Sequence, residues 1–172
     1  MPELGKKSRA NIDECDSRLI LVAERAIQIY DFSVTTGHRG RNAQETAFRT
    51  GHSKADWLES PHNYTPSMAF DAVPYYKTSP HFRWGSSKAI LDHFTQRQAV
   101  DHKTLKRLLR DYSKEIASFY IMQTFIFMAG RELGILLVNG SDWDSDLDIT
   151  DQSFDDLGHT ELANWRDMVV KP

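Results

Sequence analysis

Two short clusters rich in histidine and carboxylate residues, near opposite ends of the chain, place the strongest constraint on how it can fold. The first, residues 60–71, reads SPHNYTPSMAFD, and the second, residues 154–162, reads FDDLGHTEL. Together they offer His62, Asp71 and His159 as metal ligands. Because imidazole nitrogen and carboxylate oxygen both suit zinc, one ion bound by both clusters would tie distant segments of the chain together.

A further carboxylate, three positions before His159, points to a catalytic metal site. A catalytic zinc site commonly takes three protein ligands and leaves the fourth position to water, and a nearby carboxylate can accept a proton from that water. Asp156 is the candidate for this general base, and Asp155 and Glu161 compete for the role. The residues alone barely separate the three carboxylates, but the combination predicts a zinc hydrolase.

Composition and charge are those of an ordinary globular protein. The chain has 172 residues, of which 40% are hydrophobic, which is enough for one domain with a core. We expect residues 1–172 to form this single domain and to act as a monomer. The formal net charge of -3 gives no reason to expect nucleic-acid binding. The single cysteine, Cys15, excludes an internal disulfide.

The sequence lacks the patterns of a leader or a membrane helix. Its start, MPELGKK, is polar and has no apolar core of the kind found in a signal peptide. The most apolar stretch, residues 116–129, is shorter than the roughly 20 residues that a membrane helix needs. This stretch therefore predicts a buried helix, and we expect no membrane insertion.

Helical and extended patterns are mixed along the chain. Apolar residues at helical spacing predict a helix near 19–30, capped by Asp16 or Ser17, and further helices over 42–50 and most of 101–134, the last capped by Asp101. Short β-branched or apolar runs predict strands over 32–36, 68–73, 135–138 and 159–165. Because helices and strands do not alternate regularly, the pattern indicates an α+β fold.

Two motifs carry a resemblance to a known family. One is Ser60-x-His62 followed by Pro66-Ser67-x-Ala69-x-Asp71, and the other is Asp156-x-x-His159-x-Glu161-Leu162. Supporting residues are Thr36-Gly37-His38-Arg39, Gln44 and Gly51-x-Ser53-Lys54. From about residue 32 to residue 165, the chain resembles the D-Ala-D-Ala metallopeptidase superfamily, and most of all its phage L-alanyl-D-glutamate endopeptidases, which lyse cell walls. The resemblance implies a small antiparallel sheet flanked by helices, of the hedgehog and DD-peptidase type.

The resemblance also implies roles for particular residues. Zinc would be held by His62, Asp71 and His159, with Asp156 as the catalytic base. Arg39 would help to polarise the scissile carbonyl, since a fixed guanidinium can stabilise a developing oxyanion. The implied substrate is the peptidoglycan stem peptide. As in phage endolysins, the implied enzyme is made in the host bacterial cytoplasm and is released to the cell wall at lysis.

Residues 77–102 resemble an insertion into this family pattern. Loops and insertions beside a rigid scaffold often carry function. We consider two roles for this segment, which are a lid and a wall that selects substrates.

An acidic stretch precedes the second cluster. Asp144, Asp146 and Asp148 have the spacing of the first ligands of an EF-hand calcium loop, and Asp155 stands at the last ligand position. Ile149 stands where such a loop needs glycine. Two readings follow: a calcium site that orders the second cluster, and a solvated acidic loop without an ion.

The sequence alone also allows other functions. A D-Ala-D-Ala carboxypeptidase or dipeptidase fits the same motifs, because the sequence does not define the substrate pocket. A non-catalytic metal-binding module of a virion, or one that binds cell walls, has no need of a base such as Asp156. A calcium-binding interaction protein built on residues 144–155 leaves the first cluster unexplained.

Overall fold

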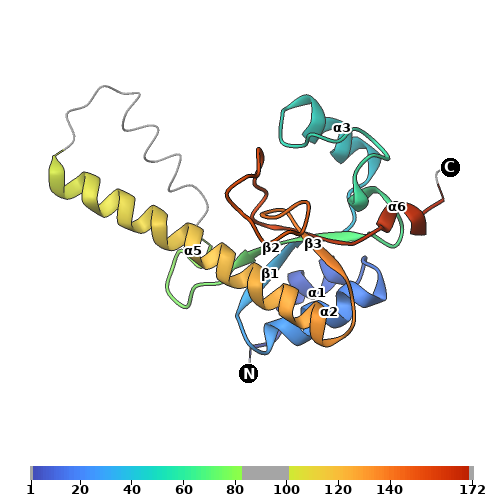
Figure 1. The fold of residues 1–172 in the computed structure, drawn as a ribbon, viewed down its shortest axis with the longest axis horizontal. Helices are drawn as coiled ribbons and strands as arrows, with labels where there is room; N and C mark the ends of the chain where they lie inside the picture. The colour runs from blue at the N-terminus through green and yellow to red at the C-terminus, as the bar shows by residue number, and fades with distance from the viewer. Residues whose placement is uncertain (1, 83–100, 171–172) are drawn as a thin grey trace.

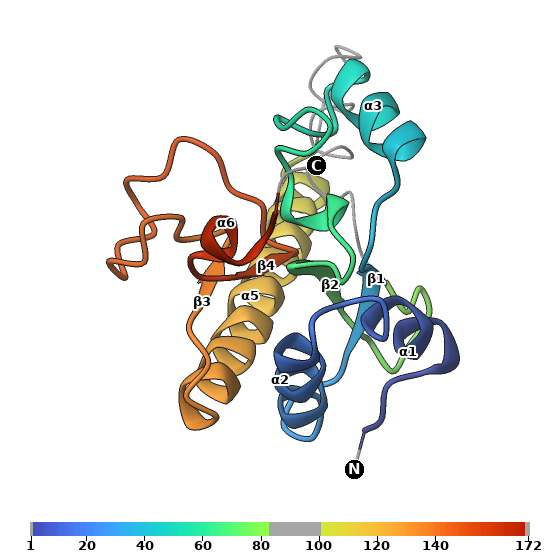
Figure 2. The same ribbon diagram turned by 90° about the vertical axis from the view of Figure 1, so that its right-hand side faces the viewer.

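An antiparallel sheet lies at the centre of the molecule and brings the two clusters side by side. The computed structural model describes residues 2–82 and 101–170, and within these ranges the strands are β1 (Phe32–Thr36), β2 (Ala69–Pro74), β3 (Leu137–Asn139) and β4 (His159–Leu162). Their order is β1-β2-β4-β3, and each neighbouring pair is antiparallel (Figures 1 and 2). The predicted α+β fold with a small antiparallel sheet flanked by helices is confirmed.

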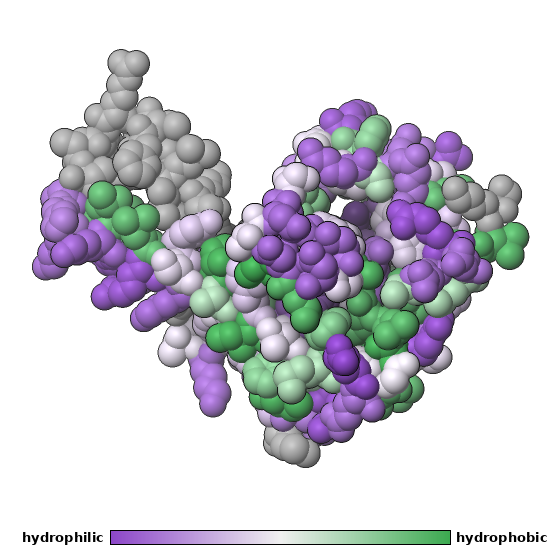
Figure 3. Space-filling view, in the orientation of Figure 1, coloured by the Kyte–Doolittle hydropathy of each residue, from purple (hydrophilic) through white to green (hydrophobic). Residues whose placement is uncertain are grey.

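The long helix α5 (His102–Glu132) crosses behind the sheet and contacts both β2 and β3 (Figure 2). It also packs against α2 (Ser17–Ile27). Its buried side chains recur at helical spacing through its second half and include Phe119, Met122 and Ile126. The stretch predicted as a buried helix over 116–129 is helical, but only one face of it is buried, since Ile121 and Met128 are exposed. The first half of α5 projects from the body of the molecule and carries mainly hydrophilic side chains (Figures 1 and 3).

Shorter helical segments surround the sheet. In chain order they are α1 (Lys6–Ile12), α3 (Arg41–Arg49), the 3-10 turn η1 (Pro61–Asn63) and α6 (Trp165–Met168). The segment α1 packs beside β1, and η1 contacts β2. Because η1 lies inside the first cluster and α6 follows the second, the sheet and these short segments together position both clusters.

Side-chain caps begin the two long helices where the sequence predicts them. Asp16 accepts the main-chain N–H of Arg18 at 3.0 Å and so begins α2. Asp101 accepts the N–H of Thr104 at 3.0 Å and so begins α5. Each carboxylate satisfies one of the N–H groups that the first turn of a helix leaves without a partner.

The last strand is shorter than the prediction of 159–165. It ends at Leu162, and α6 follows where the strand was expected to continue. Asn164 turns the chain between the two elements with a φ of 57°, in the left-handed region that asparagine tolerates better than most residues. A local polar residue therefore overrides the apolar pattern of this segment.

The prediction of a strand over 135–138 is also shifted in the structure, where β3 begins at Leu137. Gly134 ends α5 with a φ of 70°, and the N–H of Ile135 still donates to the carbonyl of Gly130 at 2.8 Å. This is the usual way in which glycine closes a helix, so Ile135 belongs to the helix end.

The helix α1 was not expected, because only Ser8 and Ile12 of its residues are buried and so short a segment has no clear periodicity.

Residues 83–100 of the insertion expected over 77–102 lie outside the described residues. Within the described ranges, none of the helices combines the length and the apolar character needed to cross a membrane.

Candidate metal centre

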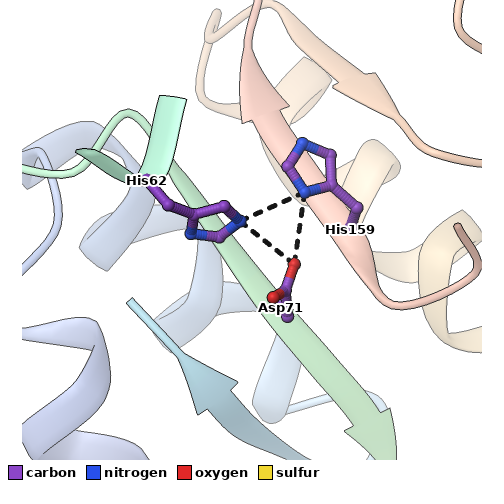
Figure 4. A group of neighbouring side chains, drawn as sticks. All are labelled: His62, Asp71 and His159. Atoms are coloured by element: carbon purple, nitrogen blue, oxygen red, sulfur yellow. Dashed lines mark hydrogen bonds and ion pairs between the residues drawn. The ribbon is translucent and has the colours of Figure 1, made fainter. Parts of the chain in front are cut away.

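His62, Asp71 and His159 point toward one another beside the sheet (Figure 4). His62 Nε2 and His159 Nδ1 each lie 3.2 Å from Asp71 Oδ1, and the two nitrogens are 3.3 Å apart. The structure thus brings together the three ligands proposed from the sequence, with all three ligand atoms within 4.8 Å of one another. The group has the donor atoms and the spacing to hold one metal ion, whose identity as zinc stays a prediction.

The register of the sheet places two of these side chains. Asp71 on β2 lies directly opposite His159 on β4, so both side chains leave the same face of the sheet. His62 comes from η1, which Ser60 caps and which lies against β2. Its ring meets the ring of His159 edge to face, with 5.2 Å between centroids. Three separate segments therefore converge on one point.

Each histidine uses its outer ring nitrogen for a hydrogen bond that fixes the ring. His62 Nδ1 lies 2.7 Å from the carbonyl oxygen of Gly37, and His159 Nε2 lies 3.0 Å from Glu161 Oε2. Because a carbonyl and an ionised carboxylate only accept, both outer nitrogens carry the proton. In the neutral rings the inner nitrogens keep the lone pairs that a metal ion requires.

The charges of the centre shift two pKa values in opposite directions. Burial disfavours a charged imidazole, but hydrogen bonds to Asp71 and Glu161 outweigh this effect and raise the pKa of His159 to about 10. Burial also disfavours an ionised Asp71, but the charge of His62 and hydrogen bonds from both histidines hold the pKa of Asp71 well below its usual range. A proton therefore competes with a metal ion for His159.

Asp156 lies close to this cluster, and it lines one surface cleft together with all three proposed ligands. Its N–H donates to the carbonyl of Gly140 at 2.7 Å, and its own carbonyl accepts the N–H of His159 at 3.0 Å. Burial, followed by the negative charge of Asp71, raises the pKa of the Asp156 carboxyl group above its ordinary value. A carboxylate with a raised pKa is a better proton acceptor near neutral pH.

Glu161 and Asp155, the two other candidates for the general base, have different surroundings from Asp156. Glu161 accepts hydrogen bonds at both oxygens, from His159 Nε2 and, at 3.1 Å, from Trp165 Nε1. Asp155 is exposed and is not among the described residues that line the cleft. These positions favour Asp156 as the base, an assignment that stays a prediction.

Arg39 follows β1 and reaches the oxygen of Asp71 that faces away from the histidines. Its Nη2 lies 3.3 Å from Asp71 Oδ2, and its Nη1 donates to Gln44 Oε1 at 3.3 Å. Gln44 is fully buried on α3 and donates to the carbonyl of Ala55 at 2.6 Å. The guanidinium is therefore fixed beside the cluster, although its proposed action on a substrate carbonyl is untested.

A cleft of about 350 Å³ opens beside the cluster, and its lining includes Arg39, Lys54, Asp156, Glu161 and Arg166. In the space-filling view, a recess with hydrophilic walls separates the lobe that carries α3 from the centre of the molecule (Figure 3). One wall of the cleft is aromatic. The ring of Trp143 lies 5.3 Å from the ring of His159 and 6.4 Å from that of Phe154.

Two residues that support the second cluster were not identified from the sequence. Gln123 on α5 is almost fully buried, and its amide donates to the carbonyl of His159 at 3.3 Å and to that of Asp156 at 3.5 Å. The sequence does offer one indication for Gln123, because it is a lone amide in the most apolar stretch of the chain. Trp143 gave no comparable signal, because nothing in the acidic stretch indicates which side chain it contacts.

The acidic stretch does not gather the four calcium ligands proposed from the sequence. The grouped carboxylates within 4.8 Å are instead those of Asp142, Asp144 and Asp146. Asp148 accepts the main-chain N–H of Thr150 at 2.9 Å and its hydroxyl at 2.6 Å. Asp148 and Asp155 both lie outside this group. Calcium binding at Asp144, Asp146, Asp148 and Asp155 stays a prediction.

Comparison with known proteins bears on the fold. No protein-family model matches the sequence, and a search of curated proteins gives no significant match. The crystal structure of the Serratia marcescens L-Ala D-Glu endopeptidase ChiX resembles this structure with a TM-score of 0.59 and 21% sequence identity. The match covers 95% of this chain and 90% of that one. The chain therefore shares its fold, over almost its whole length, with a solved peptidase.

Proposed function

We propose that this protein is a zinc-dependent peptidase that cleaves the stem peptides of peptidoglycan at the bond between L-alanine and D-glutamate. The observation that carries the proposal is the meeting of His62, Asp71 and His159 at one point beside a cleft. The fold shared with the Serratia marcescens L-Ala D-Glu endopeptidase supports the choice of substrate and bond. The sequence motifs around both clusters support the same choice.

The donor set fits zinc. Two imidazole nitrogens and one carboxylate oxygen form a combination that catalytic zinc sites use, with one position left open. His62 and His159 are 2% and 5% exposed, and each has its outer nitrogen tied to an acceptor. Such second partners orient metal-binding histidines and make them more basic. A structural role for three polar side chains alone would not require both inner nitrogens to face one carboxylate oxygen.

The residues around the cluster have distinct roles in the proposed reaction. A bound zinc ion supplies Lewis acidity and makes a water molecule more acidic. Asp156 accepts the proton of the attacking water and returns it to the leaving amine. Arg39 donates hydrogen bonds to the carbonyl oxygen of the substrate as negative charge develops on it. Glu161 does not exchange protons with the substrate and instead holds the ring of His159.

Digestion of purified peptidoglycan, followed by mass spectrometry of the fragments, tests the proposal. The zinc-loaded protein should release fragments with a new N-terminal D-glutamate, and a chelator should stop their release. Loss of terminal D-alanine alone would instead identify a D-Ala-D-Ala carboxypeptidase. Unchanged peptidoglycan in the presence of fully zinc-loaded protein would contradict the proposal and favour a non-catalytic metal-binding module.

A further inference from the structure

Two cationic side chains, Lys54 and Arg166, stand at the boundary between the cleft of the metal centre and a second pocket. Both residues line the cleft, and both also line the adjoining pocket of about 440 Å³. The adjoining pocket has an apolar part formed by Leu58, Trp165 and Val169. A peptide that extends from the metal centre into this pocket would pass both cations.

Each of these cations lies over an aromatic ring near the metal centre. Lys54 Nζ lies 5.9 Å from the ring centroid of Phe154, which stacks on Trp143, the residue packed against His159. On the other side, Arg166 Cζ lies 4.4 Å from the ring of Trp165. Each cation is thus connected, through packed side chains, to the residues that surround His159.

The ring of Trp165 is itself fixed by the metal centre. Its Nε1 donates to Glu161 Oε1 at 3.1 Å, while the other oxygen of Glu161 accepts the proton of His159. The position of Arg166 is therefore linked to that of a proposed zinc ligand. Arg166 is therefore part of the surroundings of the metal centre and is not an isolated surface charge.

Among the described residues, neither Lys54 nor Arg166 forms an ion pair. Arg39, in the same cleft, is paired with Asp71 at 3.3 Å. Glu59 lines both pockets, but its Oε2 accepts the N–H of Asp56 at 2.9 Å, and it pairs with neither cation. A cation held over an aromatic ring keeps its full charge. Among the described residues, the cleft therefore presents two positive charges that no ion pair neutralises.

We propose that Lys54 and Arg166 bind the free carboxylate of the residue that follows the scissile bond, and so select an acidic over an amidated substrate. The inference rests on the proposed function. When D-glutamate is joined to the next residue through its side-chain carboxyl, its α-carboxylate remains free and negative. Amidation of that group removes the charge, and with it the attraction to both cations.

The test compares two synthetic stem peptides that differ only in this group, which is a carboxylate in one and a carboxamide in the other. The zinc-loaded wild-type protein should cleave the acidic peptide with the higher kcat/KM, by about tenfold. Lys54→Gln and Arg166→Gln should each reduce this preference by about threefold, the scale expected for one exposed charge pair. Their kcat/KM for the amidated peptide should stay close to that of the wild type.

Charge-conserving and remote substitutions provide the controls. Lys54→Arg should keep the preference, because it retains the positive charge. Lys114→Gln on α5 and Arg49→Gln on α3 change exposed cations that line neither pocket, and both should behave as the wild type. Melting temperatures of the variants should match, since Lys54 and Arg166 are exposed.

The outcomes separate this inference from the proposed function. Equal cleavage of both peptides by the wild-type protein would overturn the carboxylate site and leave the peptidase in place. Equal loss of activity toward both peptides in Lys54→Gln and Arg166→Gln would also overturn it. The cations would then support the cleft without binding the carboxylate. Cleavage of neither peptide by the zinc-loaded wild type would overturn the proposed function and this inference with it.

Discussion

Glu161 accepts the Nε2 proton of His159 at 3.0 Å, and this contact turns the Nδ1 atom of His159 toward Asp71. The two residues lie two positions apart on β4, so their side chains leave the same face of the strand. A carboxylate that the sequence offers as a possible base is therefore the residue that orients a ligand. Asp156, which also lines the cleft, remains the proposed proton acceptor.

Glu161→Gln should weaken metal binding. The amide is a poorer acceptor than the carboxylate and no longer favours the orientation and basicity of His159. Loss of such a partner typically lowers metal affinity by about 10- to 100-fold. Competition with a zinc-binding dye measures the effect, and Glu3→Gln, at an exposed position near the N-terminus, is the matched control. An unchanged affinity would show that Glu161 does not support the metal centre.

Zinc binding should release about one proton from His159 between pH 7 and 9. The raised pKa of about 10 means that this residue is protonated in the metal-free protein over this range, whereas a metal ligand must be neutral. Apparent zinc affinity should therefore rise with pH up to about the pKa of His159. Calorimetric titration in buffers with different ionisation enthalpies counts the protons. A release of zero protons would contradict the proposed ligand role of His159.

Asp156→Asn should keep zinc and lose hydrolysis. The amide cannot accept the proton of the attacking water, and loss of a general base typically costs about two orders of magnitude or more. Asp155→Asn is the matched control, because the neighbouring residue is exposed and lies outside the cleft lining among the described residues. Zinc content and stem-peptide turnover are measured together. If Asp155→Asn abolished turnover while Asp156→Asn did not, the base would be Asp155.

Gly140→Ala should reduce turnover with little change in zinc content. A Cβ atom at position 140 would lie 2.3 Å from the carbonyl oxygen of Asp156, so the main chain that carries the base must move. A displacement of about 1 Å can cost roughly 100-fold in rate. Gly5→Ala is the control, since a Cβ at that position meets no atom within 4 Å. Wild-type turnover in Gly140→Ala would mean that this contact does not position Asp156.

Local patterns in the sequence predict the elements that carry the ligands, but not how those elements pair. The strand containing Asp71 and the start of the strand at His159 were both expected from their residues. That the two ligands face each other is set by the pairing of β2 with β4, which joins segments far apart in the chain. No local pattern encodes that register, although the chemistry of a shared metal ion predicts that the residues meet.

The supporting contacts were less predictable for a similar reason. Gln123 reaches the carbonyl of His159 from the middle of α5, and Gly37 accepts the Nδ1 proton of His62 from the end of β1. Both contacts depend on tertiary packing, and one of them uses a main-chain atom that any residue could supply. Asn164 shows the opposite case, because a single local residue ends β4 where the apolar pattern predicts that it continues.

Crystals soaked in zinc, with anomalous diffraction measured on both sides of the zinc absorption edge, test the central claim most directly. The account predicts one strong anomalous peak within about 2.0–2.2 Å of His62 Nε2, Asp71 and His159 Nδ1. The peak should vanish in His62→Ala and in His159→Ala. A principal zinc site elsewhere, or full retention of the peak in both variants, would contradict the assignment of His62, Asp71 and His159 as the metal centre.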